Sequence, residues 1–255
     1  MKLALLQTQL HWEAPDKNRQ SLANELADLA PVDLVVLPEM FTTGFSMGAE
    51  ALAETMAGPT VSWMQAMART HQAVFCGSVI IESERGYTNR LLWVGPEGSV
   101  EYYDKRHLFR MSEEHQHYTP GIDRLSTTIA GFNCCPLICY DLRFPVFSRT
   151  QATDTDLLIY VANWPAKRAT HWRTLLQARA IENQCYVVGV NRLGTDGNRV
   201  AYQGDSMVVD FQGEVLRDAT DRRGWHYATL DLNALKDYRA AFPAWMDQDD
   251  FTLTR

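Results

Sequence analysis

The chain has 255 residues, of which 46% are hydrophobic and 22% charged, a balance typical of a globular protein with a large core. Its net charge is −7 and its basic residues are scattered, which argues against nucleic acid or an anionic membrane as a partner. Five cysteines, with Cys134 and Cys135 adjacent, match neither a disulfide scaffold nor the spaced pairs of a zinc site. We therefore expect a small-molecule partner and no metal.

The chain starts with a short apolar run that stops at Gln7, too short for a signal-peptide core, so we predict a first strand and a cytoplasmic protein. Val-, Ile- and Leu-rich runs indicate strands buried on both faces. Helical spacing of apolar residues fills several gaps between them. The predicted strands are 2–6, 33–38, 73–81, 134–139, 156–162 and 185–190, and the predicted helices are 16–30, 60–70 and 168–183.

Two segments interrupt this alternation of strands and helices. Gly95-Pro96-Glu97-Gly98 lies between two extended runs and is typical of a hairpin turn, as is the later run from Asp210 to Gly213. A mixed sheet is therefore favoured over a purely parallel one. No Gly-, Ser- or Pro-rich linker divides the chain, so we expect one α/β domain over residues 1–255.

Three predicted strands end in a chemically capable residue: Glu39, Lys105 and Cys139. In open α/β sheets the ligand crevice lies beyond strand ends, so these side chains are candidates to meet there. The run after Cys139 suits a helix with Pro145 in its first turn. The unpaired N–H groups of such a helix would lower the pKa of the thiol, which makes Cys139 the candidate nucleophile.

Each of these residues also has a less specific interpretation. A free cysteine is commonly a small core residue. Glu39 can be an exposed carboxylate at a strand end, and Lys105 can belong to a solvated face. The three together, each at the end of a predicted strand, favour a catalytic site.

These segments resemble the nitrilase (carbon–nitrogen hydrolase) superfamily, whose Glu-Lys-Cys triad is carried in this order. LPEMFTTGF at 37–45 is similar to the glutamate segment, YDKRHLF at 103–109 to the lysine segment, and LICYDLRFP at 137–145 to the cysteine segment. Tyr-Asp after the cysteine looks most like the omega-amidase group. The resemblance implies a four-layered α-β-β-α sandwich with mixed sheets, no cofactor and a homodimer.

The resemblance also implies a mechanism. Cys139 attacks an amide carbonyl, Lys105 and the backbone N–H of Tyr140 hold the oxyanion, and Glu39 moves the protons. Glu114 precedes HYTPG at the spacing of a second glutamate beside the lysine, with Glu113 as an adjacent rival. The expected substrate is a short dicarboxylic acid monoamide, such as 2-oxoglutaramate or succinamate.

A pocket for such a substrate needs apolar walls and a partner for the free carboxylate. Arg143 either binds that carboxylate or caps its own surroundings, and Asn163-Trp164 is similar to the pocket edge of relatives. His115 and His117 lie in a polar stretch and are assigned to a pocket rim or solvated loop. The predicted lining comprises Met40 together with the substrate-binding set Phe41, Phe45, Arg143, Asn163 and Trp164.

The amino-acid sequence alone leaves several alternative functions to consider. A nitrilase, an N-carbamoyl amino acid hydrolase and an acyltransferase would share the thioester step, and only family likeness separates them from an amidase. A Cys-His protease is disfavoured because no Asn or Asp context of papain-like enzymes is evident. A non-enzymatic binding module is disfavoured by the apparently intact triad.

Overall fold

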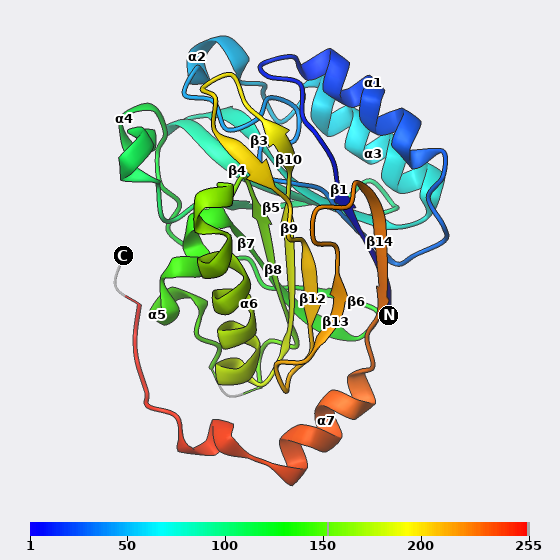
Figure 1. Cartoon of the computed structure of the whole chain (residues 1–255), viewed down its shortest axis with the longest axis vertical. Helices are drawn as coiled ribbons and strands as arrows, with labels where there is room; N and C mark the ends of the chain where they lie inside the picture. The colour runs from blue at the N-terminus through cyan, green and yellow to red at the C-terminus, as the bar shows by residue number, and fades with distance from the viewer. Residues whose placement is uncertain (152, 254–255) are drawn as a thin grey trace.

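The computed structural model describes residues 1–151 and 153–253, and within them the strands form two six-stranded mixed sheets and one short hairpin (Figure 1). The first sheet has the order β14-β1-β2-β3-β4-β5. Strands β1, β2 and β3 are parallel, and β14 and β4 run antiparallel to them. The edge strand β5 pairs antiparallel with β4 and so runs in the same direction as β1, β2 and β3. The strands of this sheet are β1 (Lys2–Gln7), β2 (Leu34–Val36), β3 (Val74–Ser83), β4 (Gly86–Val94), β5 (Val100–Asp104) and β14 (Gly224–Thr229).

The second sheet repeats this plan in the order β13-β12-β9-β8-β7-β6. Strands β7, β8 and β9 are parallel, β6 and β12 run antiparallel to them, and the edge strand β13 pairs antiparallel with β12. A separate antiparallel pair, β10 (Leu193–Thr195) and β11 (Ala201–Gln203), projects beside this sheet. The strands of the second sheet are β6 (Thr127–Ile129), β7 (Phe132–Ile138), β8 (Leu157–Ala162), β9 (Tyr186–Asn191), β12 (Met207–Val209) and β13 (Val215–Asp218).

The helices lie mainly on the outside of the two sheets (Figure 1). Proline occupies the first position of α1 and α3, where its missing N–H costs no helical hydrogen bond. The helices are α1 (Pro15–Leu26), α2 (Ala49–Leu52), α3 (Pro59–His71), α4 (Glu114–His117), α5 (Pro145–Ser148), α6 (Ala169–Asn183) and α7 (Leu232–Ala241). Short 3₁₀ turns are η1 (Arg110–Ser112), η2 (Cys139–Arg143), η3 (Ala166–Arg168) and η4 (Ala244–Asp247).

Successive side chains of a strand point to opposite faces of its sheet, so the two faces of each sheet contribute to different parts of the core. In β2, Leu34 and Val36 face a core shared with the second sheet, whereas Val35 points to the opposite core under α1 and α3. On the second sheet, α6 packs so closely that a side chain at Gly189 would collide with Leu176. The order of layers is therefore helix, sheet, sheet, helix, and the predicted α-β-β-α sandwich with mixed sheets is confirmed.

All six predicted strands and three predicted helices are present, with small shifts at their ends. The strand predicted at 33–38 is shorter, and the helix predicted at 16–30 ends at Leu26. Both hairpins are confirmed: Gly98 (φ 86°) and Gly213 (φ 90°) adopt the left-handed conformation that glycine tolerates best. Within the described part of the chain, no helix combines the length and apolar character needed to cross a membrane.

Candidate active site

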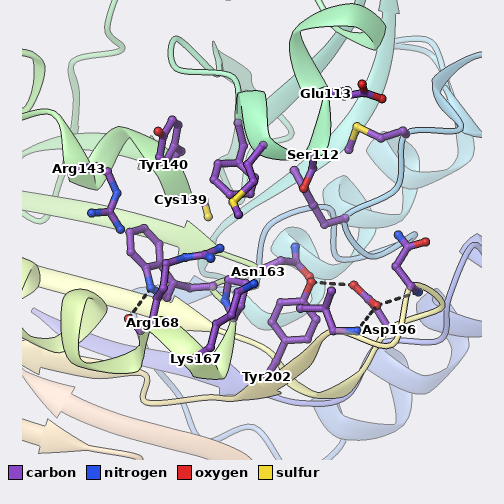
Figure 2. A pocket seen from close by; sticks show the side chains of 18 of the residues that line it. Ser112, Glu113, Cys139, Tyr140, Arg143, Asn163, Lys167, Arg168, Asp196 and Tyr202 are labelled. Atoms are coloured by element: carbon purple, nitrogen blue, oxygen red, sulfur yellow. Dashed lines mark hydrogen bonds between the residues drawn. The ribbon is translucent and has the colours of Figure 1, made fainter.

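The three residues predicted at strand ends come together between the two sheets. Glu39 follows β2 and Lys105 follows β5 in the first sheet, and Cys139 follows β7 in the second. The Lys105 Nζ lies 2.8 Å from the Glu39 Oε1, although the residues are 66 positions apart. Lys105 and Cys139 line one pocket (Figure 2), and Cys139 also interacts with the Glu39 carboxylate.

Both oxygens of the Glu39 carboxylate are held by donors from other strands. Oε1 accepts hydrogen bonds from Lys105 and from the Asn89 Nδ2 of β4, each at 2.8 Å. Oε2 accepts the backbone N–H of Asn163, just past β8, at 2.8 Å, and the Asn163 Nδ2 donates to the Glu39 carbonyl oxygen at 2.6 Å. A buried carboxylate with this many donors has a defined orientation.

The Lys105 ammonium is buried between two carboxylates. Its Nζ lies 3.0 Å from each carboxylate oxygen of Glu114, in addition to Glu39, and 5.0 Å from the Phe45 ring centre. Burial by itself would lower the pKa of Lys105, but the charges of Glu114 and Glu39 outweigh it and raise that pKa above its usual value. The two carboxylates therefore favour the charged form of Lys105.

Of the two adjacent glutamates, Glu114 and not Glu113 lies beside the lysine. Glu114 begins α4, is fully buried, and also accepts the backbone N–H of Phe109. Burial and the nearby Glu39 raise its pKa, while Lys105 opposes that rise. Glu113, just before α4, is exposed at the pocket rim. His115 and His117 on α4 are exposed as well, but they do not line the pocket.

Cys139 begins a tight 3₁₀ turn in which its own backbone is strained. Its φ is 43°, a left-handed conformation that costs a non-glycine residue free energy and is often found at functional sites. The turn is anchored by the buried Asp141, whose carboxylate accepts the Ile138 N–H at 3.0 Å, the Tyr103 hydroxyl at 2.7 Å and the His107 N–H at 3.1 Å. Asp141 thus holds the nucleophile candidate in place.

The helix expected directly after Cys139 is not present. The turn is followed by α5, which has four residues and begins at Pro145 as predicted. The predicted lowering of the thiol pKa is also wrong: burial raises the pKa of Cys139 well above its usual value, Glu39 adds to this, and Lys105 only partly opposes it. A thiol in this setting needs a base to remove its proton, because no helix dipole supplies the stabilisation.

A pocket of about 480 Å³ opens above Cys139, a size suited to a small substrate (Figure 2). Four of the five predicted substrate-binding residues line it, namely Phe45, Arg143, Asn163 and Trp164, and Tyr140 lies in the wall as well. Phe41 does not, so its prediction is wrong. Its ring packs in the core under α3, 6.0 Å from Trp63 and against Gly77, and Met40 is likewise a core residue.

Part of the pocket wall comes from a hairpin that the sequence did not point to. The Asp196 carboxylate accepts the backbone N–H groups of Asn198 and Val200, each at 2.9 Å, and the Tyr202 hydroxyl at 2.7 Å (Figure 2). These contacts stiffen the β10–β11 hairpin, which closes one side of the pocket. The sequence Asp196-Gly197-Asn198 is typical of a turn and could have predicted the hairpin. It could not have predicted that the hairpin packs over Cys139.

An α-β-β-α sandwich with a thiol, a lysine and a carboxylate at its strand ends, and a second carboxylate beside them at the start of α4, is the arrangement expected of a nitrilase-superfamily hydrolase. The chain belongs to that group: the family model described as carbon-nitrogen hydrolase matches residues 2–240. The resemblance inferred from the three segments is therefore confirmed.

Individual relatives agree with this assignment. The chain is 48% identical to the omega-amidase YafV of Escherichia coli (strain K12) over 99% of this chain and 98% of the relative. It is 33% identical to the 2-oxoglutaramate amidase of Bacillus subtilis (strain 168) over 84% of each. The structure of XC1258 from Xanthomonas campestris, a CN-hydrolase superfamily protein with an arsenic adduct in its active site, has a TM-score of 0.98 at 45% identity, covering 100% of this chain and 99% of that one.

Proposed function

We propose that this carbon–nitrogen hydrolase is an omega-amidase, which releases ammonia from the terminal amide of short dicarboxylic or 2-oxo dicarboxylic acid monoamides. The similarity to an omega-amidase along almost the whole chain and to a 2-oxoglutaramate amidase supports the substrate class. The observation that carries the chemistry is the buried Glu39–Lys105 contact of 2.8 Å beside Cys139 at the pocket floor.

In the first half of the proposed reaction, Glu39 takes the proton of the Cys139 thiol as the sulfur attacks the amide carbonyl carbon. The carbonyl oxygen becomes an oxyanion, which the Lys105 ammonium and the Tyr140 backbone N–H stabilise. Glu39 then returns its proton to the amide nitrogen, the carbon–nitrogen bond breaks, and ammonia leaves. A thioester between Cys139 and the acyl group remains.

In the second half, a water molecule replaces ammonia in the pocket. Glu39 removes a proton from this water as its oxygen attacks the thioester carbonyl, and the same two donors hold the second oxyanion. The carbon–sulfur bond breaks, the proton on Glu39 passes to the sulfur, and the carboxylic acid is released. Glu114 supports both steps by holding Lys105 together with Glu39 and by orienting the attacking water.

A substrate panel tests the proposal. We expect the highest kcat/KM for dicarboxylate monoamides such as succinamate and 2-oxoglutaramate, and lower values for neutral amides of equal length, because binding the distant carboxylate positions the amide carbon at Cys139. Ammonia release is the measurement. A higher kcat/KM for simple nitriles or N-carbamoyl amino acids than for every monoamide tested would overturn the assignment, and efficient transfer to an amine acceptor would favour an acyltransferase.

We further propose that the protein is cytoplasmic and acts as a homodimer. The proposed interface comprises residues 143–149 and the face of α6 over residues 170–179. An exposed apolar side chain within this interface supports it, since Val146 of α5 is 58% exposed. We expect light scattering at micromolar concentration to give twice the 29.0 kDa of one chain. A strictly monomeric mass would contradict the dimer.

A further inference from the structure

The pocket above Cys139 carries more cationic side chains than its own carboxylates neutralise. Lys105 is paired with Glu39 and Glu114, but Arg143, Lys167 and Arg168 also line the pocket (Figure 2). The two acidic residues in the wall do not compensate for them. The Asp196 carboxylate is used by its own hairpin, and Glu113 is exposed at the rim and forms no ion pair with the described residues.

Arg168 has a fixed backbone, and its guanidinium has no polar partner among residues 1–151 and 153–253. Its N–H donates to the Pro165 carbonyl oxygen at 2.9 Å, and its carbonyl oxygen accepts the Trp164 Nε1–H at 2.8 Å. The guanidinium lies 5.3 Å from the ring centre of Phe109, which also lines the pocket. Among the residues that the structure describes, no side chain or carbonyl group forms an ion pair or hydrogen bond with this guanidinium, whose one contact is the Phe109 ring.

The other two cations are less suited to receive an anion. The Arg143 Nη2 contacts the His171 Nδ1 at 3.2 Å on the exposed side of the site, and its guanidinium lies 5.2 Å from the Trp164 ring centre. Lys167 is exposed, and a hydrated ammonium on a flexible stem binds a carboxylate with less geometric definition. Arg168, half-buried and supported by an aromatic face, presents a planar fork that matches both carboxylate oxygens.

We propose that Arg168 binds the free carboxylate of the substrate and thereby determines the preference for ω-amides of short acids over neutral amides. This inference rests on the proposed function and assigns its carboxylate partner to η3, the turn after β8, instead of to Arg143 beside the nucleophile. The Trp164 indole fixes the Arg168 backbone, and the Phe109 ring supports the guanidinium in the pocket wall. The anchored carboxylate then sets the distance from the amide carbon to Cys139.

The test compares succinamate with butanamide, in which a methyl group replaces the carboxylate, on the parent and on three variants. We expect Arg168→Met to lower kcat/KM for succinamate by about 10- to 150-fold, the range for a lost hydrogen bond to a charged group, and to lower the succinamate-to-butanamide ratio by most of that factor. Arg168→Lys should recover part of the ratio. The matched Arg143→Met removes a neighbouring guanidinium and should change the ratio by less than about threefold.

The same proteins separate the possible failures. A parent enzyme that does not prefer succinamate to butanamide would overturn the proposed function itself. If the parent enzyme prefers succinamate and the succinamate-to-butanamide ratio is unchanged in Arg168→Met, only the role of Arg168 is overturned. The same conclusion follows if the ratio collapses in Arg143→Met and not in Arg168→Met. Inhibition by succinate provides a binding measurement independent of chemistry, and its inhibition constant should rise in Arg168→Met. If Arg168→Met does not fold, Arg168→Lys and Arg168→Gln decide the question by the same ratio.

Discussion

Replacing Cys139 with alanine will abolish amide hydrolysis, with a loss on the order of 10⁶-fold in kcat, as when a hydrolase loses its nucleophile. No other cysteine lines the pocket among the described residues, so no second thiol can take over the attack. The fold should persist because the turn is held by the Asp141 carboxylate and backbone groups, not by the sulfur. Alanine also tolerates φ 43° about as well as cysteine does.

The measurement is ammonia release, combined with circular dichroism and thermal unfolding. Cys185→Ala is the matched control because Cys185 is a fully buried core residue just before β9. It should lose about 1 kcal/mol of stability and retain turnover. Near-normal turnover of Cys139→Ala would overturn the central assignment, and a loss of turnover shared by both variants would point to a defect of folding.

Replacing Glu39 with glutamine should impair both halves of the reaction. General acid–base catalysis contributes about 10²- to 10⁴-fold in a single step, and here one carboxylate moves protons in acylation and in deacylation. The amide cannot accept the thiol proton. The glutamine side-chain amide also fits its surroundings poorly. In either orientation its NH₂ group faces a hydrogen-bond donor, the Lys105 ammonium in one and the Asn163 backbone N–H in the other.

Steady-state ammonia release and the intact mass of the protein after mixing with succinamate test this expectation. We expect Glu39→Gln to lose at least about 10³-fold in kcat and to accumulate no thioester, since acylation itself is slowed. Glu113→Gln makes the same chemical change at the exposed neighbour of Glu114 and should stay near the parent. Rapid thioester formation in Glu39→Gln would show that a different group removes the thiol proton.

Much of the architecture follows from local patterns in the chain. The runs of β-branched and leucine residues predict the strands that form both sheets, and the two Gly-containing turns predict the hairpins that make each sheet mixed. The same patterns place Glu39, Lys105 and Cys139 at strand ends, and the rule that parallel strands present their carboxyl ends at one edge brings such residues together. Periodicity and turn chemistry are short-range properties, so the sequence alone carries them.

Only the tertiary structure decided which neighbours along the chain face the site. Phe41 and Phe45 are four residues apart, yet one packs under α3 and the other beside Lys105, and of Glu113 and Glu114 only the second turns inward. The pKa of Cys139 likewise depends on burial and on Glu39, from another sheet. Arg168 reaches the pocket because η3, after β8, packs against β11 of the neighbouring hairpin. These outcomes depend on the packing of elements far apart in sequence, where rotation of one turn by a single residue exchanges a core position for a pocket position.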